Sequence, residues 1–199
     1  EAVGARPVSV QSYKRGATDF SSQIARLKTD EVDLVVLGTI VRETVGAMAA
    51  ARNLGWNPAF LVSQAGYSMA VAALGKDTVE GLYAGVVTPL PYADTASAPV
   101  LDWMKRYKAR TQQDAAIEAV VGYAQITLAA QGIANAGRDL TAGSLVAGLE
   151  RIRNHRNIFG ASPMSFSADN HLGSRRSALA RLQQGRWVLL TDFMYHGDK

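Results

Sequence analysis

The residues best suited to bind a small molecule stand together in one turn, Gly38-Thr39-Ile40-Val41. This turn follows an unbroken apolar run, residues 34–37, and a helical pattern begins directly after it. Apolar runs of this kind are typical of strands buried on both faces of a parallel sheet. In α/β proteins the turns at the carboxyl ends of such strands hold ligands, so the pattern marks this turn as a candidate binding site.

A second set of residues suggests catalysis or metal binding instead. Hydrolases and metal sites use histidine and aspartate, and the later part of the chain contains His155, His171, His196, Asp169 and Asp192. The sequence has no Gly-x-Ser-x-Gly elbow, no His-x-x-x-His helix and no glycine-rich phosphate loop. Residues 169–173, Asp-Asn-His-Leu-Gly, suit a hairpin turn. We therefore predict that the chain is not an enzyme and uses no metal or cofactor.

The composition is that of a folded domain. Of the 199 residues, 48% are hydrophobic and 19% are charged, which excludes a disordered or fibrous class. The net charge of +4 is scattered, and the densest basic group, residues 151–156, suits a solvated helix end, so no nucleic-acid partner is predicted. The absence of cysteine excludes disulfides and thiolate sites. No signal peptide is visible, which fits a cytosolic protein, a trimmed mature form or a fragment.

The first part of the chain alternates strand and helix patterns. Short strands are predicted at residues 8–10, 34–37, 59–62 and 82–87, with helices at 19–28, 41–55 and 67–74 between them. Thr18 or Asp19 is a suitable cap for the first of these helices. Alternation with short connections predicts right-handed crossovers and a parallel sheet, so this part is an α/β domain.

The pattern changes after a proline-rich connector at residues 88–99. Helical spacing follows near residues 100–107, 116–136 and 145–152, and the long middle helix is apolar on most sides, so we expect it to be well buried. Strands are then predicted at 164–166, 175–182 and 186–191. These helices have no parallel strands of their own. Either they fold back over the first sheet, or their partner sheet lies in sequence that is not present here.

A family resemblance favours the second alternative. The order and spacing of several short motifs resemble the branched-chain amino-acid-type substrate-binding proteins of ABC transporters, which have the type I periplasmic binding fold. These motifs are Gly16…Asp19-Phe20, Asp33-Leu34-Val35-Val36, Ala51-Arg52…Gly55, Glu80-Gly81-Leu82, Gly122-Tyr123-Ala124, Phe166…Gly173 and Gly185-Arg186-Trp187. The resemblance implies a parallel, Rossmann-like sheet flanked by helices in a second lobe, together with helices that belong to an incomplete first lobe.

The resemblance also implies a division of the chain. Residues 1–89 would form the α/β core of the second lobe, 90–160 would return to the first lobe, and 161–199 would return as strands to the second. The chain would then be about the later half of a binding protein, and half of the ligand cleft would be absent.

Carried over to this sequence, the resemblance implies a ligand site between the lobes. Gly38, Thr39 and Ile40 would line the second-lobe side of the cleft, with Gln64 and Ala65 beside them. Gly38 could instead permit a tight turn and Thr39 could cap the next helix, and both roles are compatible with cleft lining. Gln64 could equally be a surface glutamine.

Two further residues are candidates for the same cleft. Tyr67 would add a ring or a hydroxyl at the mouth of the loop after the third strand. Glu118 would border the cleft from the first lobe, or it is a solvated carboxylate in the first turn of its helix.

The ligand class follows from two departures from the family pattern. Relatives that take leucine-like amino acids have an acidic residue where Gln64 stands and an aromatic residue where Ile40 stands. Glutamine cannot neutralise an ammonium group, and an unpaired cation in a closed cleft costs about 2–5 kcal/mol. Gln64 therefore suits a neutral or anionic polar group and Ile40 an apolar body. This predicts a small organic ligand, which is amino-acid-like, an amide or an aromatic acid.

The predicted function is a periplasmic, or extracellular and membrane-tethered, receptor that delivers this ligand to the membrane permease of an ABC importer. Self-association of the truncated chain through an uncovered face stays open. A ligand-sensing regulatory domain of the same fold is the alternative, followed by a small hydrolase.

Overall fold

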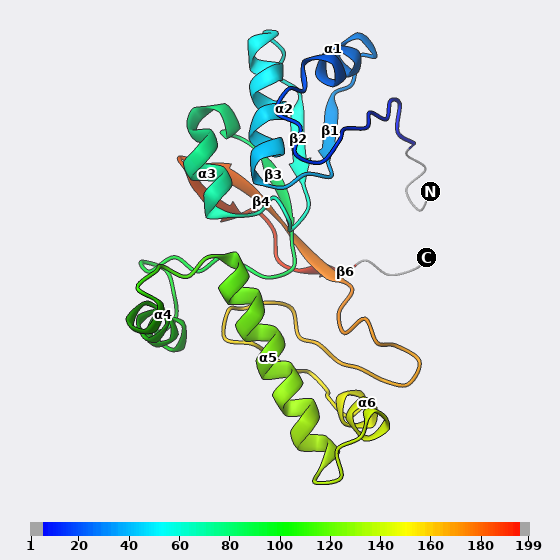
Figure 1. The fold of residues 1–199 in the computed structure, drawn as a ribbon, viewed down its shortest axis with the longest axis vertical. Coiled ribbons are helices and arrows are strands. Elements are labelled where there is room, and N and C mark those ends of the chain that lie inside the picture. Colours follow the sequence, from blue (N-terminus) through cyan, green and yellow to red (C-terminus); the bar gives the residue numbers. More distant parts are fainter. Residues whose placement is uncertain (1–5, 196–199) are drawn as a thin grey trace. The chain divides into compact units, whose positions relative to one another are not determined.

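A computed structural model describes residues 6–195. Contacts divide them into two compact units (Figure 1). Unit 1 comprises residues 6–86 and 178–192, and unit 2 comprises residues 87–177 and 193–195. The predicted division into 1–89, 90–160 and 161–199 differs from these units chiefly at its last boundary. The chain between 161 and 175 belongs to unit 2 and forms no strand.

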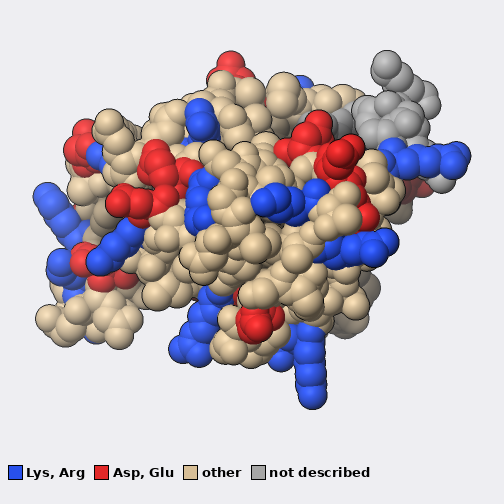
Figure 2. Space-filling view, turned by 90° about the horizontal axis from the view of Figure 1, so that it is seen from above, with Lys and Arg blue, Asp and Glu red and all other residues tan. Residues whose placement is uncertain are grey.

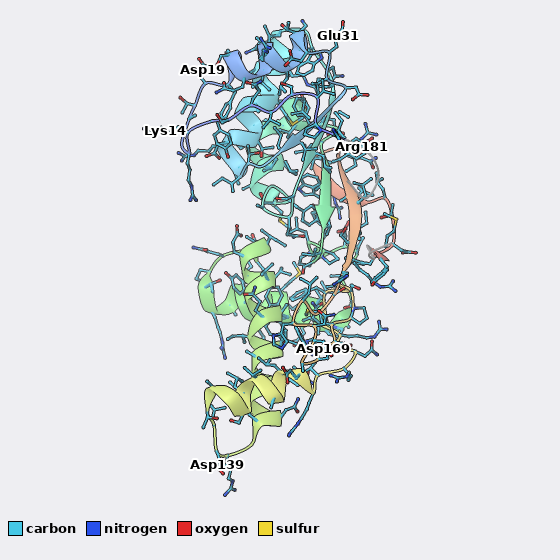
Figure 3. All side chains as sticks on the ribbon, turned by 90° about the vertical axis from the view of Figure 1, so that its right-hand side faces the viewer. Lys14, Asp19, Glu31, Asp139, Asp169 and Arg181 are labelled. Carbon is cyan, nitrogen blue, oxygen red and sulfur yellow. The ribbon has the colours of Figure 1, made fainter. Side chains whose placement is uncertain are left out.

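Unit 1 contains a sheet in the order β1-β2-β3-β4-β5. The three parallel strands are β1 (Leu34–Leu37), β2 (Ala59–Val62) and β3 (Tyr83–Val86). β4 (Arg176–Gln183) runs antiparallel to β3, and β5 (Arg186–Leu189) runs antiparallel to β4. Arg181 on β4 places its guanidinium 5.2 Å from the centre of the Tyr83 ring on β3 (Figure 3). The predicted α/β fold class with a parallel sheet is confirmed, and the later strands extend that sheet in the antiparallel sense.

α1 (Ser21–Thr29) precedes β1, α2 (Val41–Asn53) connects β1 to β2, and α3 (Met69–Gly75) with the 3-10 helix η1 (Lys76–Val79) connects β2 to β3. The N-cap residue of α1 is Phe20, so the predicted cap at Thr18 or Asp19 is wrong by position. Asp19 stands just before it, and its Oδ1 still accepts the Ser21 amide at 2.8 Å in the first turn. Hydrogen bonds from the side chain and backbone of Ser21 lower the pKa of the Asp19 carboxyl. Figure 1 shows α1, α2 and α3 on one side of the sheet, and the buried strand residues are Val35, Leu37, Phe60, Val62, Ala84 and Val86.

The parallel strands are buried on one face, not on both as the apolar run predicted. Along β1, Val35 is 5% exposed whereas Val36 is 68% exposed. The strand alternates because, among the described residues, helices cover only one face of the sheet. The predicted strand at residues 8–10 is also wrong, since Val8 and Val10 are exposed and outside any ladder. Three residues without a neighbouring strand cannot satisfy the backbone hydrogen bonds of a strand.

Unit 2 is mainly helical and contains α4 (Ala98–Thr111), α5 (Ile117–Ala136) and α6 (Ala142–Glu150). The short strand β6 (Met194–Tyr195) pairs with Arg176 and Ser177 at the start of β4. A capping box begins α6, with Thr141 and Ser144 exchanging hydrogen bonds. Ser144 also donates to the carbonyl of Asp139, which is labelled at the α5–α6 turn in Figure 3. The helices therefore join through a well-capped turn.

Two sequence predictions for unit 2 are corrected. The helix predicted to be well buried, α5, leaves Ile126 68% exposed and Ile133 45% exposed. It packs closely along α6 through small residues such as Gly132, and a helix buries only the faces that have partners. The predicted strand at 164–166 is reduced to a single bridge between Met164 and His155.

On the face drawn in Figure 2, Lys and Arg are interspersed with Asp and Glu. No helix between residues 6 and 195 is long and apolar enough to cross a bilayer.

Candidate ligand-binding site

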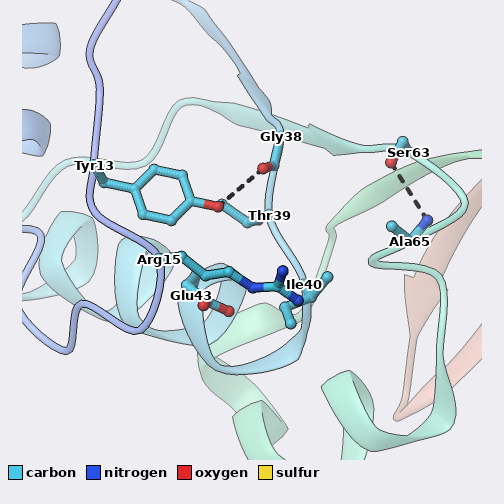
Figure 4. Close-up of a pocket in the computed structure, with 8 residues that line it drawn as sticks. All are labelled: Tyr13, Arg15, Gly38, Thr39, Ile40, Glu43, Ser63 and Ala65. Carbon is cyan, nitrogen blue, oxygen red and sulfur yellow. Dashed lines mark hydrogen bonds between the residues drawn. The ribbon is translucent and has the colours of Figure 1, made fainter.

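A pocket of about 590 Å³ opens in unit 1 at the carboxyl ends of β1 and β2 (Figure 4). It is lined by Tyr13, Arg15, Gly38, Thr39, Ile40, Glu43, Ser63 and Ala65. Its size is within the range of small-molecule sites, which is roughly 300–1,000 Å³. The turns after two adjacent parallel strands therefore meet at one concave surface.

The turn after β1 forms one wall of this pocket. The carbonyl oxygen of Gly38 accepts a hydrogen bond from the Tyr13 hydroxyl at 3.0 Å (Figure 4). A Cβ at Gly38 would meet no atom within 4 Å, and its backbone is outside the left-handed region. A tight turn therefore does not require glycine here, and the missing side chain leaves the backbone open to the pocket.

Thr39 lines the pocket without capping α2. Its side chain is buried, and its hydroxyl shares a 2.7 Å hydrogen bond with the Thr44 hydroxyl, which also bonds the Ile40 carbonyl oxygen. The residue before α2 is Ile40, and no side chain caps this helix. The capping alternative for Thr39 is therefore wrong. Ile40 is 45% exposed and presents an apolar surface to the pocket.

The turn after β2 contributes fewer residues than expected. Ser63 and Ala65 line the pocket, and the Ala65 amide bonds the Ser63 hydroxyl at 3.3 Å. Gln64 is half-buried and is not among the lining residues. Tyr67 is 1% exposed, and its ring packs against Trp187 with centres 5.0 Å apart. Tyr67 therefore belongs to the core of unit 1, so it does not supply the ring or hydroxyl expected at the pocket mouth.

Glu118, the remaining predicted residue, is exposed in the first turn of α5 in unit 2. The position is one where a carboxylate is favoured by the helix dipole. Its contact with a ligand stays a prediction.

The sequence interpretation missed four lining residues: Tyr13, Arg15, Glu43 and Ser63. Glu43 is the least expected, because it is 4% exposed and yet charged. Its Oε1 accepts the Gly16 amide at 3.4 Å, while its Oε2 has no hydrogen-bond partner among the described residues. Its position could have suggested it, since Glu43 stands in the first turn of α2, directly after the turn that lines the pocket.

The histidines are not gathered into a catalytic or metal site in the described part of the chain. His171 contacts Glu150 at 2.8 Å, and His155 contacts Gln131 at 2.7 Å. Between residues 6 and 195 no three histidine, aspartate or glutamate side chains could hold a metal ion together. His196 lies outside the described residues.

Comparison with known proteins identifies the fold that presents this pocket. The sequence model of the family described as "Periplasmic binding protein" matches residues 1–186. The chain belongs to this family. No curated protein matches it in sequence.

Solved structures agree with the assignment to the periplasmic binding protein family. A branched-chain amino acid ABC transporter protein from Thermus thermophilus with bound valine has a TM-score of 0.81 at 16% identity. The match covers 94% of this chain and 52% of that one. A fatty acid ABC transporter substrate-binding protein from Thermomonospora curvata has a TM-score of 0.78 at 20% identity, covering 92% and 49%.

A third structure, the branched-chain amino acid transporter substrate-binding protein of Streptococcus pneumoniae in complex with isoleucine, has a TM-score of 0.69 at 16% identity. The match covers 92% of this periplasmic binding protein chain and 51% of the other. At such identities the likeness shows the fold, which is the type I periplasmic binding fold. The chain spans about half the length of these solved structures.

Proposed function

We propose that this chain is part of the solute receptor of an ABC importer and that its pocket forms one wall of the ligand cleft. The observation that carries the proposal is the pocket itself, which lies where the turns after β1 and β2 converge. Gly38, Thr39, Ile40 and Ala65 line it, as expected for the carboxyl edge of a parallel sheet.

The opposite wall would come from the other lobe of a two-lobed receptor. Residues 90–160 would belong to that first lobe, and Glu118 would face the ligand from it. The match to only about half the length of solved transporter proteins supports this division. Closure of the two lobes would exclude water and sequester the ligand. The closed form would then dock on a membrane permease, in the periplasm or at the outer surface of the cell.

The ligand would be a small organic molecule with an apolar part. Ile40 offers an apolar surface, while Tyr13, Ser63 and the open backbone at Gly38 offer hydrogen-bonding groups. Valine, isoleucine and fatty acids are named for the similar structures, so branched-chain amino acids, amides and aliphatic or aromatic acids are the compounds to test. Binding of this kind requires no cofactor and no turnover.

A thermal-shift screen of the complete protein that contains this chain tests the proposal. A ligand present at 100 times its Kd stabilises the folded state by about 2.7 kcal/mol, which raises Tm measurably. We expect at least one compound from the amino acid, amide or carboxylic acid groups to raise Tm in a saturable manner. Turnover of a bound ester or amide, or no response to any group, would count against a receptor.

A further inference from the structure

The pocket contains a buried carboxylate that nothing in the described structure neutralises. Glu43 is 4% exposed, and its Oε2 has no hydrogen-bond partner. Its Oε1 has only the Gly16 amide, at the long distance of 3.4 Å. Burying a carboxylate without a partner is unfavourable, so such a group is usually paired with a cation or with several hydrogen-bond donors.

No side chain between residues 6 and 195 supplies that cation. The four ion pairs in this part of the chain join Arg26 to Asp30, Arg106 to Asp102, Lys108 to Asp114 and His171 to Glu150, and none includes Glu43. Arg15 lines the same pocket, but its side chain is exposed and forms no ion pair with this carboxylate. The amino-terminal end of α2 favours a negative charge in its first turn, where Glu43 stands, but it leaves Oε2 without a donor.

Among the described residues that line the pocket, Glu43 is the one acidic residue. Gln64, which stands in the neighbouring turn, is uncharged and does not line it. Glu43 is itself a lining residue, so a cation bound in the pocket lies beside this carboxylate. The site thus has an apolar surface at Ile40, just before α2, and a carboxylate with an unsatisfied oxygen in the first turn of α2.

We propose that Glu43 is the specificity-determining residue of this pocket and receives a protonated nitrogen of the ligand. The inference rests on the proposed receptor function and refines its ligand class. The ligand carries an ammonium or amidinium group beside an apolar body, and this group donates to the Glu43 carboxylate. This replaces the neutral or anionic polar group that Gln64 alone suggests, because the pocket holds its negative charge on the helix and not on the turn after β2.

Titration calorimetry of the complete protein with four matched probes tests the proposal. L-leucine and 3-methylbutylamine carry an amine on an apolar skeleton, whereas 4-methylpentanamide and 4-methylpentanoate lack it. We expect the wild type to prefer the two amines. Glu43→Gln, which keeps the size and an acceptor for the Gly16 amide, should lower amine affinity about 10- to 100-fold, as for loss of a charged hydrogen bond. It should leave the affinity for the amine-free probes unchanged or raise it.

Two further variants separate binding from folding. Glu43→Asp keeps the charge and should retain the preference for amines, whereas Glu31→Gln removes an exposed surface carboxylate and should bind all probes as the wild type does. Unfolding of each variant is measured alongside, because a structural role for Glu43 would weaken all four probes together and would contradict the proposal. If the wild type binds only the two amine-free probes, the proposed role of Glu43 is wrong, while the receptor function stands. Binding of none of the four overturns the role of Glu43 and, if the wider screen is also negative, the receptor function.

Discussion

Replacing Trp187 with alanine is expected to destabilise the protein by about 3–5 kcal/mol, as for other buried aromatic side chains. Trp187 on β5 is 4% exposed, and its ring packs against Tyr67. Its Nε1 donates to the carbonyl oxygen of Ser68 at 2.9 Å in a buried hydrogen bond. Truncation would open a cavity and leave that carbonyl without this donor, and both effects are unfavourable. Urea unfolding measures the change.

The same contact anchors the chain that leaves the pocket. Tyr67 and Ser68 follow the Ser63–Ala65 turn after one intervening residue, and the Ser68 hydroxyl caps α3 by accepting the Val71 amide. Trp187→Phe is the matched variant, because it keeps a ring but removes the donor, and it should cost about 1–2 kcal/mol. Equal losses for Trp187→Ala and Trp187→Phe would show that ring packing contributes nothing, contrary to this account.

Gly148→Ala is expected to destabilise unit 2 by about 1–3 kcal/mol through overpacking. Gly148 lies in α6 at its closest approach to α5, where a Cβ would collide with the carbonyl oxygen of Gly132. It would also stand 2.8 Å from the Ala136 amide nitrogen. These atoms are helix backbone, so neither helix can relieve the overlap by a rotamer change. Loss of helical circular dichroism on heating reports the effect.

Gly143→Ala in the same helix is the control for helix propensity. A Cβ at Gly143 would meet only the Thr141 hydroxyl, at 3.9 Å. Alanine is favoured over glycine in helices by about 0.5–1 kcal/mol, so this variant should be neutral or slightly more stable. If both alanines stabilise the protein, α5 and α6 do not pack as closely as described.

The sequence predicted those features that depend on local pattern. The apolar runs at 34–37 and 59–62 became β1 and β2 with unchanged bounds, because four apolar residues followed by a polar turn have few alternatives in an α/β domain. The pocket position followed from them, since parallel strands end at one edge. Features that depend on partners were not predictable from pattern. Val36 on β1 and Ile126 on α5 are both apolar, so pattern alone predicts that they are buried. Both are exposed, because no element of the described structure covers them.

The pocket residues divide in the same way. Gly38, Thr39, Ile40 and Ala65 were found because they directly follow strands. Tyr13 and Arg15 were not, because they reach the pocket from a loop with no regular period. Tyr67 was misplaced because an aromatic residue after a turn can point into the core or into a cleft, and only its contact with Trp187 decides which.

The most direct test of the central claim is to fill the pocket and measure binding. Ala65 lines the pocket, whereas Ala73 is an exposed residue of α3 outside it, so Ala65→Trp and Ala73→Trp form a matched pair. Each is titrated in the complete protein with the compound that the thermal-shift screen selects. If the ligand is held at the turns after β1 and β2, Ala65→Trp should lower the affinity for that ligand by about 100-fold or more, roughly 2.7 kcal/mol. Ala73→Trp should bind the ligand with wild-type affinity. Wild-type affinity in Ala65→Trp would show that the ligand binds elsewhere.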